Sequence, residues 1–247
     1  MSLLLAALLA PFQLFSPRQA SHHSRLAARQ VGTALAVQAP LDQGTLVVRD
    51  DTAAIAREAF RLSAVRVGLN GTGWALAATA RYDRGRPIVS LAPTLTVQSD
   101  SQPLSLEFEV ADPREPLRIL GQSARGRFTV RLLGLRSERA REFPVAGRTV
   151  VLDDSVYALY VFAAWEARPQ PVEVTALVVR AGRRETLSLQ DLGMTPTTLN
   201  RDPATLRHIT VTGGANQLVH LWLDASGHLL KVEIPSRRVR VERVPPA

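Results

Sequence analysis

The sequence predicts a mainly β protein. We expect one large antiparallel meander sheet, strongly curved or closed to a half-barrel, with one helix on its concave face. Short apolar runs recur along the chain and are separated by turns rich in Gly, Asp and Asn. One stretch, at about 154–166, has the length and composition of a helix. A sheet of about a dozen strands must curl, close or split.

The clearest hairpin lies near the end of the chain. Leu218–Asp224 and His228–Pro235 are two β-compatible apolar runs, and the residues between them end in a glycine, as in a short hairpin loop. We expect Trp222 to pack into the core, opposite Leu230 or Val232.

The N-terminal region has an apolar run, Leu3–Ala10, with the length of a signal-peptide core and too short to span a bilayer. No Lys or Arg precedes this run, and the residue two places before Ala20 is an arginine instead of a small residue. We interpret residues 1–20 as a signal peptide or apolar N-terminal segment, 21–43 as a linker and 44–247 as one β domain. A disordered or interfacial amphipathic start is the alternative. We expect a periplasmic or otherwise exported protein.

The stretch Ala54–Leu62 is ambiguous between helix and strand. Its residue types favour a helix. Its polarity alternates, however, and it follows an apolar run, Thr45–Val48, and a turn at Asp50–Thr52. We predict a strand, because an apolar run followed by a tight turn and a second alternating run is typical of a β-hairpin.

The other strands are predicted from the same alternation. Residues 193–203 are polar and are predicted to form a loop. Pro93 is expected at a bulge or an edge break. The remaining strands are expected at 74–82, 88–97, 104–110, 117–120, 127–133, 139–143, 172–179, 185–189, 206–212 and 238–244.

The predicted helix follows Asp153 and Asp154, which offer an N-cap, and ends before Pro169. It is apolar nearly all round and must be buried on several sides. Its aromatic residues, together with one from the C-terminal hairpin, are either ordinary core or the lining of an apolar ligand pocket between helix and sheet. These pocket candidates are Tyr157, Tyr160, Phe162, Trp165 and Trp222.

Catalytic and metal-binding patterns are weak. The chain has no cysteine, which excludes thiolate nucleophiles, disulfides and zinc–thiolate sites. Ser123 lies in an imperfect nucleophile elbow whose second glycine is one place late. His208, His220 and His228 lie in neighbouring predicted hairpins, and the first two would be potential metal ligands only if they shared a face. We expect no enzyme, metal or cofactor.

The formal net charge is +8, and Lys231 is the only lysine among 30 basic residues. This arginine use reflects either genomic base composition or attraction to an anionic partner. Residues 236–243 alternate after Pro235, with Arg238 and Arg240 on one face of the last predicted strand and Arg237, just before its start, on the other. These arginines either protect a solvated outer strand from association or bind anionic envelope surfaces. A nucleic-acid site is not expected, since no aromatic residue is interleaved for base stacking.

Three stretches carry a resemblance: Gly44–Leu62, Val151–Tyr157 and Leu221–Pro235. They resemble uncharacterised bacterial cell-envelope β domains, which tend to have a Gly-Arg-Glu-x-Phe stretch, a Leu-Asp-Asp segment before a helix and a Trp-x-Asp hairpin. Ala56 replaces the glycine of the first of these. More distantly, the layout is similar to the periplasmic lipoprotein-carrier fold, a curved sheet that holds acyl chains. The resemblance implies an exported protein with an apolar ligand and implies no catalytic residue.

Two functional hypotheses follow. The first is an exported, non-enzymatic protein that binds an amphipathic or apolar ligand, such as a lipid, between the curved sheet and the helix. The second is an envelope scaffold without a small ligand, which meets a protein partner through its sheet edges. A hydrolase with an unrecognised site is a weaker third. The sequence does not indicate an oligomeric state.

Overall fold

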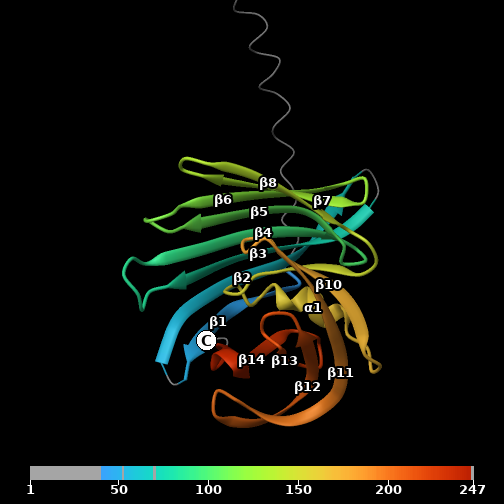
Figure 1. Cartoon of the computed structure of the whole chain (residues 1–247). Coiled ribbons are helices and arrows are strands. Elements are labelled where there is room, and N and C mark those ends of the chain that lie inside the picture. The colour runs from blue at the N-terminus through green and yellow to red at the C-terminus, as the bar shows by residue number, and fades with distance from the viewer. Residues whose placement is uncertain (1–39, 52, 69–70, 246–247) are drawn as a thin grey trace, which may run out of the picture. The chain divides into compact units, whose positions relative to one another are not determined.

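The computed structural model describes residues 40–51, 53–68 and 71–245 (Figure 1). The predicted signal peptide and most of the predicted linker lie outside these residues. Within them the chain forms fifteen strands, one α-helix, α1 (Tyr160–Glu166), and a 3₁₀ turn, η2 (Pro235–Arg237). The strands are β1 (Asp42–Asp50), β2 (Ala53–Val67), β3 (Gly71–Tyr82), β4 (Val89–Gln98), β5 (Pro103–Ala111), β6 (Leu117–Ala124), β7 (Arg127–Gly134), β8 (Glu138–Pro144), β9 (Thr149–Leu152), β10 (Val172–Val178), β11 (Arg183–Leu199), β12 (Asp202–Gly213), β13 (Leu218–Leu223), β14 (Leu229–Ile234) and β15 (Val239–Arg243).

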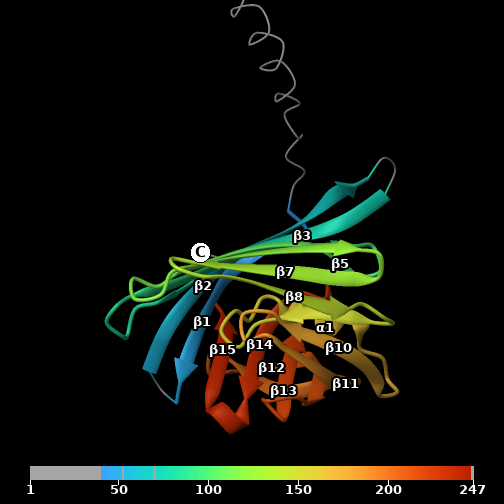
Figure 2. The same ribbon diagram turned by 45° about the horizontal axis from the view of Figure 1, so that its top comes forward.

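All fifteen strands belong to one sheet, in the order β8-β7-β6-β5-β4-β3-β2-β1-β15-β14-β13-β12-β11-β10-β9. Every pairing is antiparallel except that of β9 with β10, which α1 connects as a crossover. The first and last strands lie side by side, and β8 and β9, which follow each other in the chain, form the two ends. The sheet curls around α1 (Figures 1 and 2). The predicted mainly β, curved antiparallel sheet with one helix is confirmed.

Strand β2 shows why the alternation outweighed helix propensity. Its inward residues, Ala56, Glu58, Phe60 and Leu62, are all buried, whereas Arg57 and its outward neighbours are exposed. The antiparallel neighbours on its two sides, β1 and β3, supply hydrogen-bond partners for its backbone N–H and C=O groups. The strand prediction for this stretch is therefore confirmed.

The predicted polar loop at 193–203 is wrong. Strand β11 continues to Leu199 and pairs with β12 up to the contact between Leu199 and Asp202. The ladder has an irregularity between Asp191 and Met194, where Gly193 adopts a φ of +74°. Polar residues form strands here because one hairpin face is exposed. We call residues Met194–Leu206 the arm.

Pro93 lies within the interior strand β4 instead of at an edge. Its partner in β5 is Phe108, whereas the ladder from β4 to β3 is interrupted between Leu91 and Thr94. The interruption matches the missing N–H of proline.

The helix is shorter than predicted and begins at Tyr160. Asp153 does not cap it: its side chain accepts a hydrogen bond from the N–H of Ser155, and its backbone bridges to Val156, so the chain makes a turn. The residue at the N-cap is Leu159, which has no side-chain cap. Among the described residues, no helix has both the length and the apolarity needed to cross a membrane.

Two C-terminal predictions need correction. Strand β15 is not an outer strand, because it pairs with β14 on one side and β1 on the other. The cross-strand partner of Trp222 is Lys231, not Leu230 or Val232, and a register shift follows between Trp222 and Leu223. Trp222 is still buried, but on the sheet face that points away from α1, as described below.

Candidate functional site

A groove of about 590 Å³ opens beside the C-terminal end of α1. It lies where the start of β3, the turn between β4 and β5, the segment before β9 and the end of α1 meet. We call it the tryptophan groove. The residues of its lining that matter below are Trp74, Asp100, Gln102, Arg148, Trp165, Glu166 and Arg168.

Two tryptophans form the apolar floor of the groove. The rings of Trp74 and Trp165 meet edge to face, with centroids 5.7 Å apart and planes at 76°. Behind them the buried Phe162 meets Trp165 in the same way, at 5.3 Å and 89°. Such pairs contribute about 0.5–1.5 kcal/mol beyond the burial of their area. Both tryptophans remain partly exposed, so the floor is ordered and still accessible.

Arginines and planar polar groups form the rim. Arg148 Nε lies 3.2 Å from Glu166 Oε2. Arg168 Nη1 donates to the carbonyls of Trp165 and Ala167, both at 2.8 Å, which satisfies oxygens at the end of the helix. Gln102 Nε2 donates to the carbonyl of Gly147, while its Oε1 is buried without a hydrogen-bond partner among the described residues.

A buried carboxyl positions the segment that leads into α1. Glu58, on β2, is 0% exposed and accepts hydrogen bonds from the N–H groups of Tyr157 and Ala158, each at 2.8 Å. Burial raises the pKa of Glu58 to about 7. The Tyr82 hydroxyl donates to the carbonyl of Ser155, also at 2.8 Å. Strands β2 and β3 thus hold the approach to the helix from one side.

Arginines hold the same segment from the other side. Asp153 forms a two-nitrogen ion pair with Arg180, with both distances at 2.8 Å. Asp154 pairs with Arg183 at 3.0 Å, and its backbone carbonyl accepts a hydrogen bond from Arg237. The two aspartates therefore have separate arginine partners and do not form a carboxylate pair.

The five predicted pocket aromatics do not gather around one cavity. Tyr157 and Phe162 are fully buried core residues. Tyr160 borders an internal space of about 10 Å³, and its hydroxyl accepts a hydrogen bond from Asn216 Nδ2 at 3.3 Å. Trp165 lines the tryptophan groove. Sequence reasoning missed its partner, Trp74, for which the only signal was a tryptophan directly after a Gly-Thr-Gly turn.

Trp222 belongs to a separate cluster beneath the arm. Its ring stacks on His208, with centroids 3.9 Å apart and planes at 7°. His208 Nε2 lies 2.9 Å from His220 Nδ1, so these histidines share a face. His228 instead pairs with Asp224 at 2.8 Å. Among the described residues, no three His, Asp or Glu side chains converge as metal ligands.

The other candidates have ordinary partners. The Ser123 hydroxyl donates to the carbonyl of Pro103. Arg238 lies 4.0 Å from Asp51, and Arg240 lies 3.2 Å from Glu233. Arg237 and Arg238 precede β15 and do not alternate along it as predicted. An anionic surface as partner of these arginines stays a prediction.

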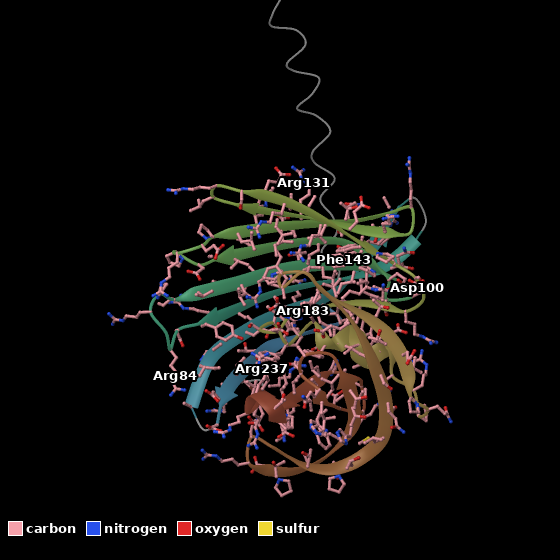
Figure 3. All side chains as sticks on the ribbon, in the orientation of Figure 1. Arg84, Asp100, Arg131, Phe143, Arg183 and Arg237 are labelled. Carbon is pink, nitrogen blue, oxygen red and sulfur yellow. The ribbon has the colours of Figure 1, made fainter. Side chains whose placement is uncertain are left out.

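The structure therefore defines a mainly β domain, an open curved sheet around one short helix, with a groove at the end of that helix. Asp100, on the groove's rim, and Arg84 lie at opposite ends of the long strands (Figure 3). No protein-family model and no curated protein matches the chain.

Among solved structures, the chain is similar to the crystal structure of a β-barrel-like protein of a domain of unknown function, DUF1849, from Brucella abortus. The identity is 10% and the TM-score 0.49, over 82% of this chain and 94% of that chain. At this level the similarity says nothing about function. Similarity to lipoprotein carriers and export to the envelope stay predictions.

Proposed function

We propose that this domain is a non-catalytic binding protein of the cell envelope that holds an amphipathic ligand in the tryptophan groove. The observation that carries the proposal is the partly exposed pair of Trp74 and Trp165 beneath a rim with two arginines. Aromatic rings beside a few placed polar groups are typical of ligand sites. The envelope location rests on the apolar run Leu3–Ala10.

The groove suits the apolar part of a ligand better than the space between sheet and helix does. The space beside Tyr160 holds about 10 Å³, whereas the groove holds about 590 Å³. A methylene chain needs continuous apolar contact, which the adjacent rings of Trp74 and Trp165 offer. We therefore place the ligand at the end of α1 and not along its buried length.

The rim favours an acidic head group. Arg148 neutralises Glu166, and Arg168 is anchored to the helix end through one nitrogen. A guanidinium has five N–H donors, so both arginines retain capacity for a phosphate or carboxylate. Asp100, on the same rim, would repel an acidic group that approaches its side of the groove.

Fluorescence titration tests this proposal. A short-chain phosphatidylglycerol, kept below its critical micelle concentration, is added to the purified domain, and tryptophan emission is followed. We expect a saturable blue shift as water leaves the groove. Trp165→Phe should weaken binding by about 5-fold or more, since losing part of a buried aromatic contact costs about 1 kcal/mol.

Trp222→Phe is the matched control, because Trp222 lies on the other sheet face. It should retain the affinity of the unmodified domain. Saturable binding that Trp165→Phe leaves unaltered, or no binding of any short-chain amphiphile, would contradict the proposal. Phosphatidylcholine of the same chain length tests the head group, and we expect it to bind more weakly.

A scaffold role is the alternative, and β8 is the strand that would serve it. It is one end of the sheet, and most of its residues are exposed. Its Glu138 and Glu142 pair with Arg131 and Arg127 of β7, and charges of this kind discourage strand addition. Crosslinking followed by pulldown, with a proline placed in β8 as the disrupting change, distinguishes this role from ligand binding.

A further inference from the structure

The arm folds back over the outer face of the C-terminal strands (Figure 1). Four hydrogen bonds attach its end, and the first, from Lys231 Nζ to Thr197 Oγ1, measures 3.4 Å. Lys231 Nζ donates to the carbonyl of Thr198 at 2.8 Å, the N–H of Asn200 donates to Glu242 at 3.2 Å, and Asn200 Nδ2 donates to the carbonyl of Arg243 at 3.0 Å. Within the described part of the chain, the two strands of the arm pair only with each other, since the contact of β12 with β13 begins at Arg207. These few polar contacts hold it closed.

The base of the arm has the features of a hinge. The irregularity in β11 contains Gly193, whose φ of +74° favours glycine. The Asp191 side chain accepts a hydrogen bond from the N–H of Gly193 at 2.9 Å and another from Arg207 Nε at 2.9 Å. These two hydrogen bonds anchor the base of the hinge to Asp191. Beyond the hinge the arm is a two-stranded ribbon.

Beneath the arm lies a pair of histidines, of which His208 is buried and His220 is half-buried. His208 is stacked on Trp222 and nearly inaccessible, and its Nε2 lies 2.9 Å from Nδ1 of His220. At this distance one nitrogen donates and the other accepts, so the two facing nitrogens share one hydrogen. A first added proton goes to a nitrogen that faces away. A second puts hydrogens on both facing nitrogens, and the contact breaks.

Burial and the neighbouring His220 disfavour the charged form of His208, whereas the carboxylate of Glu233 favours it. Lys231 is buried, and its Nζ lies 5.8 Å from the ring centroid of Trp222 and 3.0 Å from Glu233. Glu233 also pairs with Arg240, so its charge is already shared between two cations. The other charged groups on or beside the arm and its contact face are Asp191, Arg201, Asp202, Arg207, Glu242 and Arg243.

We propose that the arm is a latch, closed while the His208–His220 pair shares its hydrogen and opened when both rings are protonated. Opening gives water access to the charged His208 ring and separates Lys231 from the arm. It uncovers Trp222 and the outer face of β13 and β14. This inference does not depend on the tryptophan groove.

The direction of the pH response follows from linkage. Burial, and then the neighbouring His220, lower the pKa of His208 below its ordinary 6.5. An open arm restores solvation, so the open state binds the proton more tightly. The closed state is therefore fully favoured above pH 6.5 and loses stability as the pH falls below that value.

Hydrogen exchange measured by mass spectrometry tests the latch on the full chain. Protection of peptides within Met194–Leu206 is compared at pH 7.5 and 5.0 after correction for intrinsic exchange. We expect protection to fall about 10-fold or more, as one proton bound only by the open state predicts over this range. Peptides from β3 and β4 should change little.

His208→Phe retains a ring to stack on Trp222 and removes the titrating group, so the arm should stay protected at pH 5.0. His220→Gln serves as a second variant that keeps a hydrogen-bond partner and removes the second proton. His228→Gln, at the histidine that pairs with Asp224, is the matched control and should respond like the unmodified chain. Arm protection that does not change with pH, or a fall that persists in both His208→Phe and His220→Gln, overturns the proposal.

Discussion

Glu58 and Tyr157 are joined by a hydrogen bond of 2.8 Å from the backbone N–H of Tyr157 to the Glu58 carboxylate, across 99 residues of sequence. The neighbouring N–H of Ala158 donates to the other oxygen of the same carboxylate. The contact attaches β2 to the segment before α1. Through it the sheet sets the position of the helix and thus of Trp165 in the tryptophan groove.

The first prediction concerns stability and pH. Because burial raises the pKa of Glu58 from 4.5 to about 7, the folded state retains a proton that the unfolded state releases. This contribution to stability is fully present below pH 4.5 and is lost as the pH rises to about 7. A shift of this size corresponds to about 3 kcal/mol. Denaturant unfolding at pH 4.5, 6 and 8 measures it.

The variants Glu58→Gln and Glu107→Gln isolate this effect from other titrations. Glu58→Gln should flatten the fall between pH 4.5 and 7, because its amide does not ionise. Glu107, which is exposed and paired with Arg118, is the control, and its replacement should leave the profile unchanged. If the difference in stability between the Glu58→Gln variant and the unmodified chain does not change with pH, the buried carboxyl does not titrate as described.

Much of the fold could be predicted because alternation in a half-buried strand directly reports which face is inside. Ala54–Leu62 is the instructive case, since its residue types favour a helix and its pattern favours a strand. The pairing of β1 with β15 could not be predicted, because long-range register depends on how the sheet curls. The arm was missed because its inward contacts are hydrogen bonds to Lys231 and Glu242 instead of a visible apolar pattern.

The candidate site could be predicted only in part. Trp165 was among the expected pocket residues, but Trp74 lies 91 positions earlier in the sequence, and nothing local links the two. Trp222 was expected with the helix aromatics, yet it belongs to the opposite face. The face of a strand residue changes with a shift of one position, and the irregularity next to Trp222 is such a shift.

A second prediction compares a buried with an exposed ion pair. The Asp153 side chain is 1% exposed and pairs with Arg180, which is 31% exposed. Arg180→Ala leaves a buried carboxylate without its partner and should destabilise the domain by about 3 kcal/mol. Arg118→Ala, in a pair exposed to 58% and 59%, should cost less than about 1 kcal/mol. Equal effects in chemical denaturation would contradict this account of the segment before α1.

A third prediction concerns Trp222, which is 7% exposed and stacked on His208. Trp222→Ala removes a large buried ring and should cost about 3–5 kcal/mol in unfolding free energy. The cost should appear even though the residue does not touch α1, because the arm covers it. Urea melts that show a loss below about 1 kcal/mol would mean that the arm does not bury this face in solution.

The fourth prediction addresses the proposed function by locating the ligand directly. An acidic single-chain amphiphile with a diazirine in its alkyl chain is photolysed with the domain, and the adducts are mapped by mass spectrometry. We expect adducts in the peptides that contain Trp74 and Trp165, and their loss when unlabelled phosphatidylglycerol competes. Adducts confined to other surfaces, or labelling of the groove that no competitor reduces, would contradict a ligand site at the end of α1.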